Sequence, residues 1–331
     1  MNGFRIPLGE WAEAAVDFLG DAFGWLFDLI ATVLKSVYGG LEWLLSAPPF
    51  WIVVVLLAAL AYAVRGAKLA LGTAIGLLVI VGVDQWDNAM DTLALVVVAA
   101  LVAIVIAIPI GIWAARSDRV SRIVRPVLDF LQTMPAFVYL IPAIIFFGVG
   151  AVPGMIATIV FAVAPGVRLT ELGIRGVDPE IVEAGNAFGA TPGRILRQIQ
   201  IPLALPSIMA GINQVIMLSL SMVVIAGMVG AAGLGGEIVR AIGRINVGLG
   251  FEAGVAVVIL AMILDRITSA LSTSPRTSPR TSPRRGDRVK SVKKAKTTDQ
   301  AGSSPAGGAE TPRPTHNDQS VHSTRMERTS R

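Results

Sequence analysis

Residues 178–202, DPEIVEAGNAFGATPGRILRQIQIP, decide how the rest of the chain is organised, because they form a polar segment between two long apolar runs. Asp178 is placed to cap a helix that begins with a proline, and Gly189 is placed to end that helix. Thr191 is followed by a proline in the same way, which predicts a second helix start. The segment is therefore predicted to form two short helices joined by a tight turn at a membrane surface.

The composition around this segment is typical of a polytopic membrane protein. Of the 331 residues, 53% are hydrophobic and only 15% are charged, whereas a soluble core of this size would expose far more charge. The chain has no cysteine, which excludes disulfides and thiolate chemistry. Residues 272–331 carry 13 Lys/Arg and 5 Asp/Glu, so the net charge of +5 comes from this tail and does not indicate nucleic-acid binding.

Apolar stretches of membrane-spanning character recur along the chain, and at roughly 20 residues per crossing they number about seven. Five of them lie at about 50–64, 69–83, 92–115, 203–227 and 251–270. The other two come from the stretch between 129 and about 164, which a Gly- and Pro-rich turn at 148–154 divides. The prediction is an all-α polytopic membrane protein with about seven transmembrane helices. Residues 50–84 would form two peripheral spans, and 85–271 would form the transmembrane core.

The amino-terminal segment, residues 1–49, has a different pattern. Its acidic residues recur on one helical stripe while large apolar residues line the other side, which predicts an amphipathic helix over 10–37; the stripe comprises Glu10, Glu13, Asp17, Asp21 and Asp28. Such a helix lies in a membrane interface instead of crossing the membrane. Because an acidic face is repelled by the anionic cytoplasmic leaflet, we expect this segment on the extracytoplasmic side.

The orientation follows from the charges of the loops. Arginines and lysines concentrate at 65–68, at 116–125, in the 178–202 segment and in the tail, whereas the loop 84–91 carries three Asp and no Lys or Arg. Positively charged loops remain in the cytoplasm. The amino terminus is therefore predicted outside and the carboxy terminus inside. The tail, 272–331, is predicted to be a disordered basic cytoplasmic extension, since it has too little apolar surface to fold.

The 178–202 segment resembles the EAA loop of ABC-importer permeases, with one Gly in place of the second Ala and Ile in place of the usual Leu. In that family the loop is the coupling helix that docks into a cleft of the cytosolic ATPase. The resemblance assigns ATPase coupling to Glu183, Ala184, Gly185, Gly189, Ile199, Ile201 and Pro202.

Further segments resemble the glycine betaine/proline-type permeases of these importers, for example PAFVYLIPAIIFFG at 135–148 and VAPGVRLTELGIR at 163–175. Similar segments lie at 90–93, 206–235 and 250–267. The resemblance implies a homodimeric five-helix permease core in the lipid bilayer of the plasma (inner) membrane. It also implies a cytosolic ABC ATPase subunit and an extracytoplasmic solute-binding protein as partners, and no nucleic-acid partner. The expected function is import of glycine betaine, proline or a related compatible solute by alternating access, driven by ATP hydrolysis in the partner ATPase.

Three alternatives remain open. An ABC permease for another small solute, such as choline or carnitine, would have the same features, because specificity resides mainly in the binding protein. A secondary transporter would usually show inverted repeats and intramembrane ion-coupling carboxylates, and neither is visible. A membrane scaffold without transport would leave the 178–202 segment unexplained.

No catalytic or metal-binding residues are predicted, and ATP and Mg²⁺ are expected in the partner ATPase. The glycines at 227–236 lack the Lys-Ser or Lys-Thr of a phosphate loop, so they predict a helix break. Isolated charges near span ends are interpreted mainly as interfacial anchors or helix–helix pairs, with a role in gating or coupling as the alternative; they are Asp129, Arg168, Glu171, Asp265 and Arg266. Seven residues are candidates for a translocation path, with interhelical hydrogen bonding and packing as the competing interpretation; they are Thr133, Phe137, Tyr139, Asn213, Gln214, Ser219 and Ser221.

Overall fold

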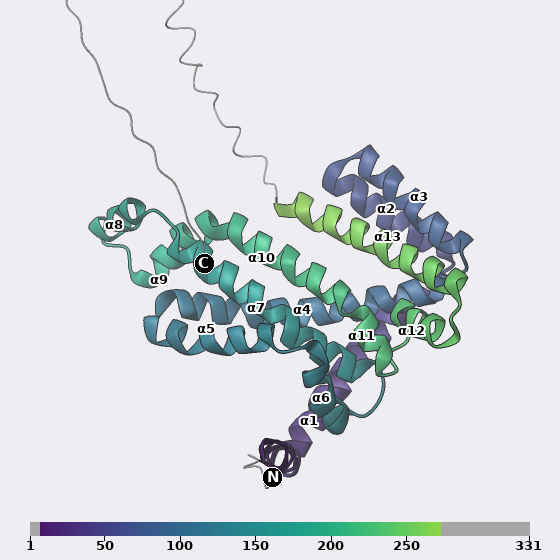
Figure 1. The fold of residues 1–331 in the computed structure, drawn as a ribbon. Helices are drawn as coiled ribbons and strands as arrows, with labels where there is room; N and C mark the ends of the chain where they lie inside the picture. The colour runs from purple at the N-terminus through teal and green to yellow at the C-terminus, as the bar shows by residue number, and fades with distance from the viewer. Residues whose placement is uncertain (1–6, 273–331) are drawn as a thin grey trace, which may run out of the picture. The chain divides into compact units, whose positions relative to one another are not determined.

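The structure, a computed structural model, describes residues 7–272, and within that range the chain forms helices joined by short turns, with no strand. The prediction for the tail therefore lies outside the described residues, apart from Ser272. The helices in chain order (Figure 1) are α1 (Leu8–Ser46), α2 (Phe50–Arg65), α3 (Ala67–Gly82), α4 (Trp86–Arg116), α5 (Asp118–Thr133), α6 (Ala136–Phe147), α7 (Ala151–Arg175), α8 (Pro179–Ala187), α9 (Pro192–Ile195), the π-helical turn Leu196–Gln200, α10 (Ile201–Ser221), α11 (Val223–Met228), α12 (Leu234–Arg244) and α13 (Val247–Ser272).

The all-α membrane class is confirmed, but the described residues contain fewer spans than the seven predicted. Four helical stretches are long and apolar enough to cross a membrane, namely α4, α7, Pro192–Met228 and α13, and up to six if two bent helix pairs each form one span. Helices α2 and α3 have 16 residues each, or about 24 Å at 1.5 Å per residue. That length is short of a hydrocarbon core of about 30 Å. In addition, the apolar stretch after Asp129 is interrupted where α5 and α6 meet at 96°.

Small residues allow α7 to pack closely against α4 and α10. A Cβ added to Gly166 would lie 2.7 Å from the Cβ of Ala107 in α4, and one added to Gly173 would lie 2.7 Å from the Cβ of Ser207 in α10. Both distances are too short for a side chain. The helix backbones can therefore approach each other because both positions are glycine, which has only a hydrogen atom in place of a side chain. This close packing places the carboxy-terminal end of α7 beside the beginning of α10, which are the two ends of the 178–202 loop.

Helices α2 and α3 form a hairpin that packs against α13 (Figure 1). Its core is formed by aliphatic side chains that are nearly or fully buried, including Leu77 and Ile80 of α3 and Leu260 of α13. Because lipid tails are as apolar as these side chains, the close van der Waals packing of the side chains holds such helices together in a membrane. The hairpin therefore belongs to the same packed unit as the long helices.

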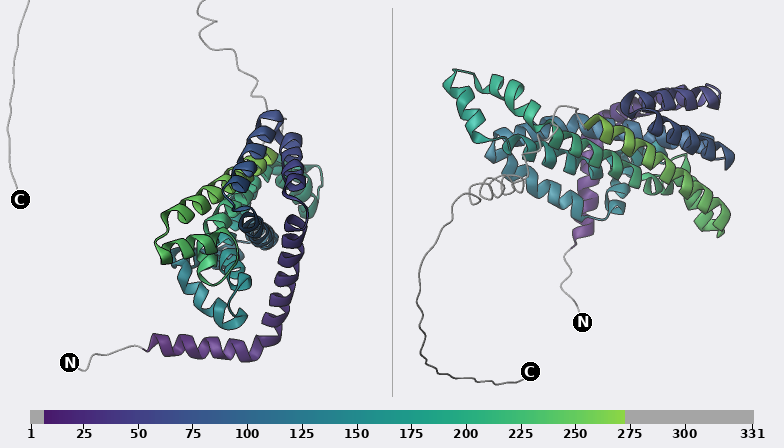
Figure 2. Two further views of the ribbon diagram at one scale, coloured as in Figure 1. Left: turned by 90° about the vertical axis from the view of Figure 1, so that its right-hand side faces the viewer. Right: turned by 90° about the horizontal axis from the view of Figure 1, so that it is seen from above.

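Helix α1 is bent, whereas the sequence predicted one uninterrupted amphipathic helix over 10–37. The bend is at Phe23, whose backbone is not helical (φ −122°, ψ 15°). Both arms lie crosswise to α4 (Figure 2). The second arm buries Leu34 and Tyr38 against α4 and α7, whereas the first arm leaves Trp11 and Phe18 exposed. An exposed aromatic face suits the predicted membrane interface, which stays a prediction.

Glycines form a sharp break between α11 and α12, at the end of the bundle that lies away from the 178–202 loop. Between α11 and α12 the chain turns through Gly230 and Gly233, which have positive φ values of 86° and 98°. A Cβ on Gly227 would lie 2.3 Å from the carbonyl carbon of Gly235, so the two backbones are in direct contact. The turn is held to α4 because the backbone N–H of Leu234 donates to the Thr92 hydroxyl at 2.8 Å. The predicted helix break is confirmed.

Candidate functional site

The 178–202 loop leaves the bundle between α7 and α10 and forms its most projecting end (Figure 1). Its first helix begins as predicted, since the Asp178 carboxylate accepts a hydrogen bond from the N–H of Glu180 at 2.9 Å. Gly189 ends this part of the loop with a φ of +76°, in the left-handed region that favours glycine. Both local signals are confirmed.

The start of the second arm differs from the prediction. Thr191 precedes the helix, but its hydroxyl makes no capping hydrogen bond. Instead its backbone carbonyl accepts from the N–H groups of Arg194 (2.9 Å) and Ile195 (3.0 Å). The second arm is also not a separate short helix, because α9 continues through the π-helical turn into α10. Together with α11, which follows after the turn at Met222, this stretch covers Pro192–Met228, 37 residues in all, so the loop is joined on this side to a membrane-length helical stretch.

The residues assigned to the loop divide into an exposed group and a packing group. Glu183, Ala184, Gly189 and Pro202 are exposed. The other three, Gly185, Ile199 and Ile201, are partly buried. A Cβ on Gly185 would lie 2.9 Å from the Cδ1 of Ile199, which indicates tight contact between α8 and the π-helical turn. Ile201 packs on a buried cluster at the end of α7. The structure thus brings all seven residues into one loop, but only the first group is available to a partner.

Two exposed apolar residues of the loop were missed by the sequence reasoning. Phe188, directly before Gly189, is 92% exposed, and Ile181 is 43% exposed. Large apolar side chains displayed on a projecting loop are typical of a protein–protein contact. The signal was present in the sequence, since Phe188 is the one aromatic residue of the 178–202 segment.

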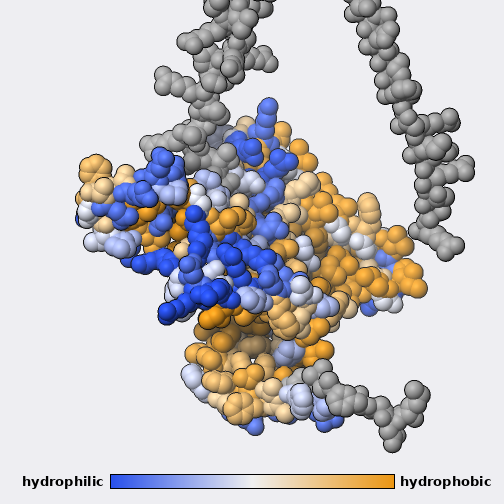
Figure 3. Space-filling model, turned by 60° about the vertical axis from the view of Figure 1, so that its left-hand side comes forward, coloured by the Kyte–Doolittle hydropathy of each residue, from blue (hydrophilic) through white to orange (hydrophobic). Residues whose placement is uncertain are grey.

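The surface around the loop is polar. Figure 3 shows hydrophilic residues gathered at the end that carries α5 and the loop, while hydrophobic residues cover much of the neighbouring surface. Exposed arginines of this end include Arg116, Arg119 and Arg122. The prediction that this end faces the cytoplasm rests on such positive charge beside apolar spans, and it stays a prediction.

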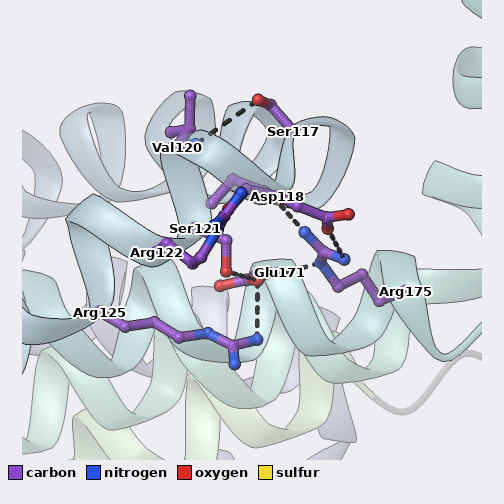
Figure 4. A network of polar contacts seen from close by, with 9 residues as sticks. Ser117, Asp118, Val120, Ser121, Arg122, Arg125, Glu171 and Arg175 are labelled. Atoms are coloured by element: carbon purple, nitrogen blue, oxygen red, sulfur yellow. Dashed lines mark hydrogen bonds and ion pairs between the residues drawn. The ribbon is translucent and has the colours of Figure 1, made fainter.

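The start of the loop is anchored by Arg175, the last residue of α7 (Figure 4). Its guanidinium donates to Asp118 at 2.7 Å and to the carbonyl oxygen of Ala114 at 2.8 Å. The Ala114 carbonyl belongs to the last turn of α4, where carbonyl groups lack helical partners and a cation is favourable. The Nε of Arg175 lies 3.0 Å from Glu171 Oε1. The Arg175 side chain therefore connects the end of α4, the beginning of α5 and the last turn of α7.

The candidate path residues form two separate groups. The first lies around the bend between α5 and α6, where the carbonyls of Leu131 and Met134 both lie within hydrogen-bonding reach of the Tyr139 hydroxyl and share its single proton. Nearby, Thr133 donates to its own helix at 3.1 Å, and Phe137 is 49% exposed. These bonds brace the bend, and Phe137 and Thr133 are the side chains of this group that are exposed to a ligand or a partner.

The second group lies on α10 and is mixed. Asn213 donates to Asp265 of α13 at 3.2 Å and accepts from Thr268 at 2.6 Å, which confirms interhelical hydrogen bonding for this residue. Ser219 is buried and donates to its own helix. Gln214 and Ser221 are exposed, with Ala210 and Met217 at the same helical face. Among the isolated charges, Asp129 pairs with Arg168 and Glu171 pairs with Arg125 between helices, which confirms helix–helix pairing for these residues, and Glu171 also pairs with Arg175 of its own helix.

Comparison with known proteins identifies the family. Residues 107–276 match the family described as binding-protein-dependent transport system inner membrane component, and the match includes the whole 178–202 loop. The glycine betaine transport system permease protein OpuAB of Bacillus subtilis is 47% identical over 258 residues, covering 78% of this chain and 92% of that protein. The glycine betaine/carnitine transport permease protein GbuB of Listeria monocytogenes is also 47% identical, with the same two coverages.

More distant similarities agree with these. The glycine betaine/proline betaine permease protein ProW of Escherichia coli is 44% identical over 257 residues, which cover 78% of this chain and 73% of that protein. Among solved structures, an inward-facing conformation of the MetNI methionine ABC transporter matches with a TM-score of 0.51 at 25% identity. That match covers 56% of this chain and 95% of the other chain, and it supports the fold.

Proposed function

This chain belongs to the binding-protein-dependent transport system inner membrane components, and we propose that it is the permease subunit of an ATP-driven importer for glycine betaine or a closely related compatible solute. The observation that carries the proposal is 47% identity over 92% of a permease that is itself named for glycine betaine transport. The exposed loop agrees with it, because an importer of this kind needs a surface through which a separate ATPase acts.

We infer three partners. A cytosolic ABC ATPase docks on the 178–202 loop, where Glu183 and Phe188 are exposed. A solute-binding protein delivers the cargo on the opposite side, and a second copy of this chain completes the pathway. ATP and Mg²⁺ are bound by the ATPase and not by this chain. This arrangement requires the amino terminus outside and the loop in the cytoplasm of a plasma-membrane protein.

The names of the relatives indicate which solutes to test first. The name of the Listeria relative includes carnitine and that of the Escherichia coli relative includes proline betaine, which are both quaternary ammonium compounds with a carboxylate. We therefore rank glycine betaine first, carnitine and proline betaine next, and choline, which lacks the carboxylate, last.

Transport by the complete assembly tests the proposal. The chain is reconstituted in liposomes with its ATPase and binding protein, and uptake of radiolabelled glycine betaine is measured with and without internal ATP. We expect uptake that requires ATP and the binding protein and is abolished by vanadate. Uptake driven by an ion gradient without ATP would instead establish a secondary transporter, and competition by unlabelled carnitine or choline ranks the solutes.

A further inference from the structure

A buried carboxylate lies at the loop end of the bundle. Glu171 of α7 is 3% exposed, and its Oε1 atom accepts two hydrogen bonds and takes part in a further ion pair (Figure 4). The hydrogen-bond donors are the Ser121 hydroxyl at 2.7 Å and Arg125 at 2.9 Å, and the Nε of Arg175 forms the ion pair at 3.0 Å. A carboxylate can remain charged when buried only if charged and hydrogen-bonding partners compensate for the loss of water, and here two guanidinium groups and a hydroxyl do so.

The donors come from two different helices. Ser121 and Arg125 lie on α5 at i and i+4, so they share one face of that helix, while Arg175 lies one turn after Glu171 on α7. Arg175 extends the set to Asp118 in the first turn of α5. The beginning of α5 is therefore fastened to the last turn of α7 by a connected set of charged groups, which we call the Glu171 cluster: Asp118, Ser121, Arg125, Glu171 and Arg175.

The position of the Glu171 cluster in the chain connects two functional regions. Arg175 lies three residues before Asp178, where the 178–202 loop begins. At its other end α5 leads directly into the bend that Tyr139 braces, next to the exposed Phe137. A displacement of the loop that pulls on the end of α7 must therefore either move α5 and the bend with it or break charged bonds around a buried carboxylate.

We propose that Glu171 is a positioning residue for energy coupling, which makes α5 follow the 178–202 loop and so transmits ATPase docking to the bend between α5 and α6. This inference rests on the proposed function, because it assumes that an ATPase acts on the loop. Glu171 acts through Arg125 and Arg175 and need not touch either the solute or the ATPase.

The same two helices provide a matched control. Asp129 of α5 pairs with Arg168 of α7, but both side chains are largely open to water, at 63% and 40% exposure. Exposed ion pairs contribute little, since water already stabilises both charges. Asp129→Asn and Glu171→Gln therefore make the same kind of chemical change between the same helices, and only the second removes the charge at the centre of the Glu171 cluster.

The test uses the full transporter in liposomes, with ATPase and binding protein. Three quantities are measured: ATPase co-purification, basal ATP hydrolysis, and the stimulation of hydrolysis by binding protein loaded with glycine betaine. We expect Glu171→Gln to assemble normally and to lose stimulation about tenfold, within the range usual for coupling between sites. Glu171→Asp, which keeps the charge, should recover part of it, Arg125→Gln should lose less, and Asp129→Asn should match the unaltered chain.

Wild-type stimulation in Glu171→Gln, or an equal loss in Asp129→Asn, would overturn the proposal. If Glu171→Gln fails to insert, Arg125→Gln decides, because the Arg125 side chain is 60% exposed and its loss leaves Arg175 on the carboxylate. Full stimulation in that variant would also overturn the proposal. A failure of the unaltered chain to import glycine betaine would instead refute the proposed function, which is a separate result.

Discussion

Individual side chains of the 178–202 loop have either a packing role or an exposed position, and their substitutions should behave accordingly. Gly185 and Ile199 are in close contact, so changes there alter the shape of the loop. Glu183 and Phe188 are exposed, and surface substitutions usually change stability by no more than about 0.5 kcal/mol. Changes at this second pair should therefore affect what the loop binds and leave its folding intact.

Glu183→Lys should insert at the normal level and lose ATPase co-purification together with substrate-stimulated hydrolysis, because it reverses a charge presented to the docking cleft. A compensating charge change on the ATPase should restore part of the activity. Transport at the unaltered rate would show that Glu183 is not a docking residue.

Phe188→Ala should weaken binding of the ATPase by about 2 kcal/mol, the size of effect found for aromatic residues at the centre of interfaces. The dissociation constant of the detergent-solubilised complex measures it. The control is Phe251→Ala, which removes another exposed phenylalanine, 72% exposed, from α13 outside the loop. Equal effects of the two substitutions would argue against an apolar contact at Phe188.

Gly189→Val should abolish coupling by a different route. No atom lies within 4 Å of the position a Cβ would take, so the strain comes only from the left-handed backbone, at about 1–3 kcal/mol for a β-branched residue. A charge change on the ATPase should not rescue it. Gly193→Val, in the same loop without a positive φ, should retain most of the stimulated hydrolysis, and a loss as large as that of Gly189→Val would contradict this explanation.

Signals carried by neighbouring residues were predictable and contacts between distant residues were not. The Asp178 cap and the Gly189 turn each depend on two or three adjacent residues, so the sequence predicted them correctly. Glu171 and Ser121 are 50 positions apart, and nothing in either local pattern indicates that they meet. Thr191 shows the limit of a local rule, because the residue type and the following proline were right and the hydroxyl bond is absent.

At the scale of helices, length was easier to predict than straightness. The apolar runs located the long helices correctly, because burial in lipid needs only a sufficient count of apolar residues. The bend at Phe23 was missed, although Gly20 and Gly24 flank it and glycine weakens a helix interior. The 96° bend between α5 and α6 coincides with Pro135, which cannot continue the hydrogen bonding of α5.

The glycine break between α11 and α12 offers a test at this scale. Gly227→Ala should sharply reduce the amount of folded protein in the membrane, because the added Cβ would lie 2.3 Å from the Gly235 backbone. The backbone segments on both sides of this contact cannot move apart without disturbing the turn. Fluorescence-detected size-exclusion chromatography measures folded protein. Gly243→Ala, in α12 with nothing within 4 Å, should be neutral or stabilising; comparable loss in both variants would remove the packing explanation.

For the whole molecule, orientation in the membrane can be determined with single cysteines, because the chain has none. Asp87→Cys, at the exposed start of α4, should react with an impermeant maleimide added outside intact cells. Asn186→Cys, exposed on α8, should react only after the membrane is permeabilised. Ser121 is unsuitable as an inside reporter because it is buried. Labelling of position 186 from outside would reverse the orientation and separate the loop from the ATPase.

The helical stretch from the loop through α10 and α11 is interrupted only locally, by the π-helical turn and by the turn at Met222, so it can act as a lever. Its 37 residues, Pro192–Met228, extend about 55 Å at 1.5 Å per residue. One end carries the surface proposed to meet the ATPase, and the other ends at the glycine break beside α4. A tilt of about 5° about one end displaces the other by about 5 Å, roughly one helical turn. A slight rotation of the docked loop would therefore be felt at the glycine break, far from the surface on which the ATPase is proposed to act.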